Sequence, residues 1–145
     1  MNTKDIGNLS EILCIAALMQ RGLSVSIPYG ENDSYDFIAD CNGSLFKLQC
    51  KTGRTVVAGE SFLIPLHTTT KNSKTSHSHG FKGLVDFIIA YYNNQVYLLP
   101  INELKANVSF QLRLTPPKNG QVKDINWAKN YELDNMMHYF VQNKT

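Results

Sequence analysis

The sequence lacks a strong charge of either sign. Its 145 residues include 14 Lys and Arg and 12 Asp and Glu, which leaves a formal net charge of +2. This balance excludes a highly basic nucleic-acid-packaging protein, and it permits DNA binding without arguing strongly for it. The length corresponds to a single domain spanning residues 1–145, and 43% apolar residues can supply one ordinary hydrophobic core.

Cysteine is also scarce, the three in the chain being Cys14, Cys41 and Cys50. No two of them form a Cys-x-x-Cys pair and their number is odd, so the spacing predicts neither a disulfide framework nor a zinc site. Each is flanked by apolar or strand-like residues, which indicates buried free thiols in a reducing compartment.

Long apolar runs are absent. The longest covers residues 12–19, well below the roughly 20 residues that a membrane-spanning helix needs. Residues 1–9 have neither the basic nor the apolar region of a signal peptide. We therefore expect a soluble, cytoplasmic protein.

Hydrophobic periodicity predicts a helix at residues 4–21, ending at Gly22. Because this helix is apolar on nearly all sides, we expect it to be packed inside the protein. Asn42-Gly43 predicts a two-residue hairpin turn, since both residues tolerate positive φ. Other patterns predict strands at 23–27, 35–40, 44–52, 61–66, 84–92 and 95–100, and short helices at 125–131 and 134–140.

Three residues around this hairpin could carry chemistry. Gln49 and Lys51 are two apart on one predicted strand, so their side chains share a face, and Asp36 lies on the neighbouring strand. Carboxylate and amide oxygens suit Mg²⁺, and a lysine could orient or deprotonate an attacking water or offset phosphate charge. The set suits phosphodiester hydrolysis. The alternative is a solvated Asp–Lys pair without function.

Glu11 is a second candidate, because it is the only charged residue between Asp5 and Arg21. A lone carboxylate on a buried helix is costly unless it is paired or lies near a metal. Glu11 could therefore face Asp36 and Lys51. The alternative is a surface carboxylate near the helix start, which the helix dipole favours.

The order of these features resembles the core of the PD-(D/E)XK nucleases, and in particular the branch that contains cyanobacterial group I intron homing endonucleases. The similar segments are GNLSE at 7–11, VSIPYGEN at 25–32, Tyr35-Asp36, QCKTGR at 49–54, VDF at 85–87, YLLPI at 97–101, LRL at 112–114 and KNGQ at 118–121. The resemblance implies an α/β fold with a restriction-endonuclease-like core, in which helices flank a mixed central β-sheet.

The resemblance also implies roles for the four candidate residues. Asp36 matches the central metal ligand, Lys51 the catalytic lysine and Glu11 the helix-borne carboxylate. Gln49 stands where Asp or Glu is commonest, although the homing-endonuclease branch also carries Gln there. We therefore expect catalysis by Glu11, Asp36, Gln49 and Lys51 with Mg²⁺, or Mn²⁺ in its place, held by Asp36, Gln49 and Glu11.

Residues 67–81 contain three successive threonines with Lys71, Lys74, His77 and His79, but few apolar residues. Such a stretch cannot bury itself, so it is predicted to be flexible. It is either a solvated loop or an arm that orders on DNA. Because DNA affinity comes mainly from cationic side chains against phosphates, the candidate DNA contacts are Arg54, Lys71, Lys74, His77, Lys82, Arg113 and Lys118.

The expected function is metal-dependent cleavage of double-stranded DNA, in the manner of a site-specific homing endonuclease. A long two-fold site needs more than one protomer, and the resemblance implies a homo-oligomer, either a dimer or a tetramer. Two alternatives remain open. One is a Holliday-junction resolvase or DNA-repair nuclease on the same core. The other is a catalytically inactive DNA-binding module, which Gln49 makes worth considering.

Overall fold

The computed structural model describes residues 1–71 and 76–141. Its long helix, α1 (Thr3–Gln20), begins after Asn2, whose side chain accepts a hydrogen bond of 2.9 Å from the Asp5 amide. It ends before Gly22, which has a φ of 87° and lets the chain turn into the sheet. The helix predicted at residues 4–21 is therefore confirmed within one residue at each end.

Five strands form a central sheet in the order β1-β2-β3-β8-β9. Their bounds are Ser24–Ser26, Phe37–Cys41, Ser44–Thr52, Phe87–Tyr92 and Gln95–Leu99. β3 and β8 run parallel and all other neighbours are antiparallel, so the predicted mixed sheet is confirmed. Asn42 and Gly43 both have positive φ between β2 and β3, as the hairpin prediction requires.

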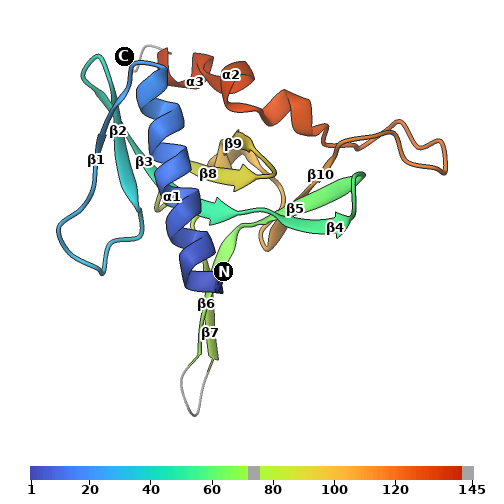
Figure 1. The fold of residues 1–145 in the computed structure, drawn as a ribbon, viewed down its shortest axis with the longest axis horizontal. Helices are drawn as coiled ribbons and strands as arrows, with labels where there is room; N and C mark the ends of the chain where they lie inside the picture. The colour runs from blue at the N-terminus through green and yellow to red at the C-terminus, as the bar shows by residue number, and fades with distance from the viewer. Residues whose placement is uncertain (72–75, 142–145) are drawn as a thin grey trace.

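Two smaller sheets extend from this core, as Figure 1 shows. One has the order β10-β5-β4, formed by Ser109–Arg113, Ser61–Pro65 and Arg54–Val57. The other is the hairpin of β6 (His67–Lys71) and β7 (Ser76–Gly80), which projects beyond the N-terminal end of α1. The sequence patterns did not predict β4, β6, β7 or β10, and the hairpin lies in the segment predicted to be flexible.

The core lies on both faces of the central sheet. One hydrophobic cluster packs α1 against β2, β3 and β8, and it is closed by the short helices α2 (Leu133–Met136) and α3 (His138–Val141). The second cluster packs β8 and β9 against β5 and β10. It also includes parts of η1 (Ile101–Glu103) and η2 (Ala128–Tyr131). The central strands are therefore covered on both sides.

The expectation that α1 is enclosed on all sides is wrong. Its buried residues are Ser10, Cys14, Ala17 and Leu18, while Ile12 is 63% and Met19 60% exposed. A helix lying on one layer buries a single stripe, and the sheet with α2 and α3 covers only that stripe. Among the described residues, no helix is both long and apolar enough to cross a membrane.

All three cysteines are free. Cys14 and Cys50 are buried, as the sequence predicts. Cys41 is only half-buried, because it ends β2 next to the exposed Asn42-Gly43 turn. The expectation of three buried thiols is therefore wrong for this one.

Gly53 marks a close approach between the end of β3 and β8. Its amide donates to the Tyr91 carbonyl at 2.9 Å, and a Cβ added at Gly53 would lie 2.7 Å from Tyr92 Cβ. We predict that Gly53→Ala lowers the free energy of unfolding by about 1–3 kcal/mol, the usual cost of overpacking.

Gly7 provides the matched control, because a Cβ there meets nothing within 4 Å. Gly7→Ala in the helix should raise the free energy of unfolding by about 0.5–1 kcal/mol. Urea denaturation of both variants measures the difference. Equal stability of the Gly53→Ala variant and the natural chain would contradict the close packing of Gly53 on Tyr92.

Candidate active site

The candidate site lies where β2 and β3 separate. Their pairing ends at Phe37 opposite Leu48, whereas β3 continues along β8 as far as Thr52 opposite Tyr91. Asp36, the residue before β2, occupies the fork. Its amide donates to the Leu48 carbonyl, and its Oδ2 accepts from the Cys50 amide, both at 2.8 Å. The fold thus fixes the Asp36 carboxylate against the free edge of β3.

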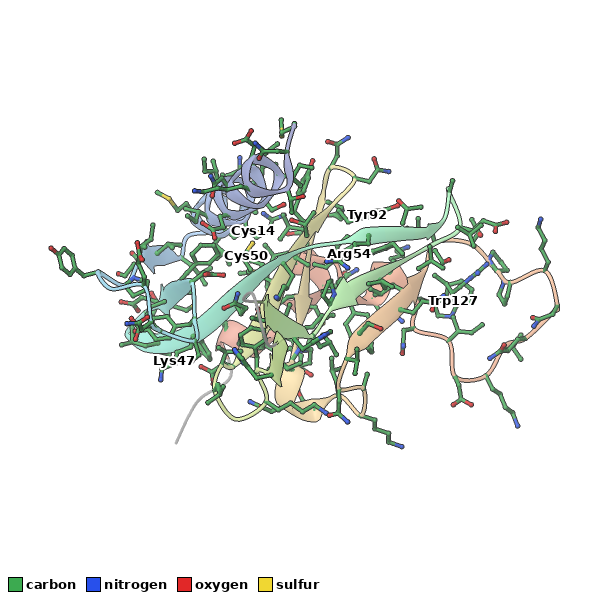
Figure 2. The ribbon with its side chains drawn as sticks, turned by 90° about the horizontal axis from the view of Figure 1, so that it is seen from below. Cys14, Lys47, Cys50, Arg54, Tyr92 and Trp127 are labelled. Carbon is green, nitrogen blue, oxygen red and sulfur yellow. The ribbon has the colours of Figure 1, made fainter. Side chains whose placement is uncertain are left out.

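Successive side chains of β3 point alternately toward α1 and toward the opposite face of the sheet. Cys50 and Thr52 face α1: Cys50 Sγ lies 3.9 Å from Cys14 Sγ, and Thr52 Oγ1 lies 2.7 Å from Ser10 Oγ. Figure 2 shows Cys14 and Cys50 together beneath the helix. Because successive side chains point to opposite faces, Gln49 and Lys51 lie on the other face, as predicted.

The contacts of α1 with β3 also place Glu11. Ser10 is 1% exposed and shares a hydrogen bond with Thr52, so the helix is held at a defined height along β3. Glu11 follows Ser10 directly and is half-buried. Of the two alternatives that the sequence left open, the structure agrees with a Glu11 that lies on the same side as Asp36 and Lys51 rather than with a solvated surface carboxylate.

One pocket of about 700 Å³ contains all four residues predicted for catalysis. Glu11 enters it from α1, Asp36 from the fork, and Gln49 and Lys51 from β3. Thr3, Ile6 and Gly7 of α1 form part of its wall. Further lining residues that sequence patterns did not single out are Pro65, His67 and Thr68.

Burial dominates the electrostatics of the two carboxylates. It raises the pKa of Asp36, an effect that the Cys50 amide and the Lys51 charge oppose. The pKa of Glu11 is also raised, first by burial and then by the negative charge of Asp36. Two partly desolvated carboxylates that repel each other would both be stabilised by a cation between them.

Burial and neighbouring groups shift the pKa of Lys51 and that of Cys50. Burial lowers the pKa of Lys51, the Asp36 charge opposes this effect, and the Arg54 charge adds to it. The Cys14 hydrogen bond, followed by burial, raises the pKa of the Cys50 thiol far above its usual range. Cys50 therefore stays protonated, and its role is packing rather than nucleophilic attack.

The ammonium of Lys51 is held by the start of the β6–β7 hairpin. Its Nζ donates to the His67 carbonyl at 3.1 Å and to Thr68 Oγ1 at 3.2 Å, and it lies 5.0 Å from the centre of the Phe81 ring. Within residues 1–71 and 76–141 there are two ion pairs, and neither includes Lys51. No local pattern could have indicated these partners, because they depend on how the polar hairpin folds back.

The predicted DNA contacts are spread over the molecule. Arg54 is exposed at the start of β4 and lines the pocket. Lys71 ends β6 and His77 lies in β7, while Lys74 falls outside the described residues.

The other three cationic candidates do not line the described pocket. Lys82 donates to the Leu104 carbonyl, Arg113 donates to the Thr115 carbonyl at 3.0 Å, and Lys118 lies 4.0 Å from Glu60. Among the predicted DNA contacts, the structure therefore places Arg54 at the candidate centre, and the hairpin reaches it through His67 and Thr68.

The donor set fits a hard divalent cation. Glu11 and Asp36 offer carboxylate oxygens and Gln49 an amide oxygen, which are the atoms that Mg²⁺ and Mn²⁺ prefer. In the described part of the chain, no three His, Cys, Asp or Glu residues cluster in a way that could hold a metal. The third donor here would accordingly be the neutral amide of Gln49.

Comparison with known proteins agrees with this geometry. A family model described as PD-(D/E)XK endonuclease matches residues 1–134, so the chain belongs to the PD-(D/E)XK endonuclease family. The fold is similar to the structure of a bacterial homing endonuclease, I-Ssp6803I, with a TM-score of 0.76, 21% identity and full coverage of both chains. A search of curated proteins found no match.

The raised pKa of Asp36 gives a signed prediction for stability. Without metal, the folded state loses stability as pH rises through the folded pKa, because the ionised carboxylate is partly desolvated. Asp36→Asn removes this titration and can still accept from the Cys50 amide. Urea denaturation in chelator should therefore show the variant gaining stability over the natural chain between about pH 4 and pH 7, since the unperturbed Asp pKa is about 3.9.

Asp134→Asn is the control with the opposite sign. Arg21 Nε lies 2.6 Å from Asp134 Oδ1 and lowers the pKa of that carboxyl, so the ionised form is favoured in the folded state. This variant should be less stable than the natural chain at pH 7, and the difference should shrink as the pH falls below about 4, through the lowered pKa of Asp134. A gain from Asp36→Asn that does not change with pH would contradict the burial of its charge.

Proposed function

We propose that the chain is a metal-dependent endonuclease that hydrolyses phosphodiester bonds of double-stranded DNA. Membership of the PD-(D/E)XK endonuclease family supports a nuclease. The observation that carries the proposal is the placement of Asp36 in the β2–β3 fork, where it shares one pocket with Glu11, Gln49 and Lys51. The fold it shares with a bacterial homing endonuclease supports site-specific cleavage of that kind.

The three oxygen donors would hold Mg²⁺, or Mn²⁺ in its place. Bound there, such a cation supplies a Lewis acid for the scissile phosphate and lowers the pKa of a coordinated water. Asp36 is the anchored ligand, because the Cys50 amide fixes one of its oxygens. Gln49 contributes no charge, so we expect this centre to hold its metal more weakly than one with Glu at that position.

Lys51 would act on the phosphate or on the attacking water. Its positive charge lies within the electrostatic reach of Asp36, and its Nζ is directed by the His67 carbonyl and Thr68. A fixed cation beside a phosphate offsets the negative charge that develops during hydrolysis, and it costs little reorganisation. Lys51 would thus stabilise the transition state.

Substrate DNA would lie across the pocket mouth between Arg54 and the β6–β7 hairpin. Arg54 is exposed and lines the pocket, and so do His67 and Thr68 at the start of the hairpin. Lys71 of β6 and His77 of β7 would extend this contact, with Lys82, Arg113 and Lys118 for a wider footprint, and Lys74, outside the described residues, is kept as a further candidate. Because the pocket provides one centre and a duplex has two strands, we propose that the chain works as a homo-oligomer, a dimer or a tetramer.

Gln49 favours one second candidate, a DNA-binding module without catalytic activity. It removes a negative charge from the position where a carboxylate would bind the cation. The module would bind duplex and four-way junction DNA but cut neither with Mg²⁺ or Mn²⁺. Cleavage of junctions alone would instead indicate a resolvase or repair role on the same core.

Asp36→Ala tests the proposed centre most simply. We predict that it reduces cleavage of supercoiled plasmid DNA in Mn²⁺ by about 100-fold or more, the scale of losing a group that stabilises transition-state charge. DNA affinity, measured by fluorescence anisotropy in chelator, should be retained. Asp33→Ala is the matched control, because Asp33 is exposed in the preceding loop and does not line the pocket. Normal cleavage by Asp36→Ala would place the centre elsewhere.

A further inference from the structure

The partners of Lys51 come from both strands of the hairpin. The His67 carbonyl and Thr68 Oγ1 belong to β6, and Phe81 directly follows β7. His67 is opposite Gly80 and Thr68 opposite His79 in the register of the pair. The catalytic lysine thus contacts the hairpin at its base, where the two strands join the body of the protein.

This base is firmly attached to the core. The Leu66 amide donates to the Val108 carbonyl at 2.9 Å, and His67 Nδ1 lies 2.9 Å from the same oxygen, to which it can only donate. Leu66 is 1% and Phe81 2% exposed, and both belong to the second hydrophobic cluster. The two acceptors of Lys51 therefore have defined positions. The ammonium must lie within hydrogen-bonding distance of both to satisfy its donors.

The lysine itself does not have a defined position without them. Its ammonium ends a flexible four-carbon stem and behaves as a rotatable point charge. It is partly withdrawn from water, where a charged donor without acceptors is costly. Thr68 supplies the only side-chain acceptor that the described residues offer to Nζ, while the His67 acceptor belongs to the backbone and survives substitution.

We propose that Thr68 is a positioning residue for Lys51. Through Thr68, the position of the base of the β6–β7 hairpin determines where the catalytic ammonium lies. The inference rests on the proposed nuclease function. The element proposed to contact DNA therefore also determines the position of the Lys51 ammonium. A displacement of the hairpin base would misplace Lys51 even with Asp36, Glu11 and Gln49 intact.

Two substitutions at Thr68 separate the hydroxyl from the shape of the side chain. Thr68→Val keeps the branched outline and removes the acceptor, whereas Thr68→Ser keeps the acceptor. Under single-turnover conditions with supercoiled plasmid and Mn²⁺, we predict that Thr68→Val lowers the cleavage rate constant about 10-fold, the scale of one hydrogen bond to a charged group. Thr68→Ser should restore most of the rate, and DNA affinity should be unchanged in both variants.

Reactivity of the Lys51 amine gives a readout that does not need cleavage. With an acylating reagent and peptide mass spectrometry, Lys51 should be labelled several-fold faster in Thr68→Val than in the natural chain, and at the natural rate in Thr68→Ser. Thr55→Val is the matched control, because it removes a hydroxyl that is hydrogen-bonded to Tyr92 OH at 2.7 Å, away from Lys51. It should leave the Lys51 labelling rate unchanged.

The outcomes test the positioning role of Thr68 separately from the proposed nuclease function. Unchanged labelling and an unchanged rate in Thr68→Val would overturn the positioning role. Weaker DNA affinity with a normal rate at saturating enzyme would also overturn it, making Thr68 a DNA contact. If the natural chain cuts no DNA, the proposed function fails, yet faster labelling of Lys51 in Thr68→Val would still show that Thr68 holds the ammonium.

Discussion

The hydrogen bond from the Cys50 amide to Asp36 Oδ2 is the contact on which the rest of the site depends. β2 leaves β3 after Phe37 and Leu48, and the carboxylate takes the place that a strand partner would otherwise have at Cys50. This satisfies a backbone donor on an open strand edge. It also fixes a negative charge where burial disfavours it. The same contact therefore stabilises the sheet edge and offsets part of the cost of burying the carboxylate charge, which a bound cation would offset further.

The two faces of β3 differ: one contributes side chains to the hydrophobic core, and the other borders the pocket. Phe46, Leu48 and Cys50 are buried in the cluster beneath α1, and Gln49 and Lys51 alternate with them. A strand covered by a helix on one face and bordered by a pocket on the other can change its chemistry without losing its core. Register matters accordingly, because a slip of one residue would exchange the apolar face with the face that carries Gln49 and Lys51.

The sequence predicted those parts of the site that depend on short-range patterns. The helix bearing Glu11, the Asn42-Gly43 turn and the spacing of Gln49 and Lys51 are local, and the packing of α1 on β3 then brings the four residues into one pocket. The rest depends on pairing between distant segments. Sequence patterns did not predict β10, which completes a sheet with β5 through the pairing of distant residues such as Phe110 with Ile64.

The hairpin and the outer side of α1 escaped prediction for a related reason. β6 and β7 are polar, so their composition did not indicate strands, whereas the structure pairs them and flanks them with the buried residues Leu66 and Phe81. On α1, apolar content indicated enclosure, but the surrounding layers cover only the stripe through Cys14 and Leu18. Composition indicates which residues could be buried, whereas the arrangement of the helices and strands determines which of them are buried.

Paramagnetic broadening by Mn²⁺ tests the proposed metal centre most directly. In amide spectra of the isotopically labelled protein at substoichiometric Mn²⁺, the signals of Glu11, Asp36 and Gln49–Lys51 should disappear first, because broadening falls steeply with distance from the ion. Prior broadening around His77 and His79, or a uniform loss of signals, would contradict a metal centre at the β2–β3 fork.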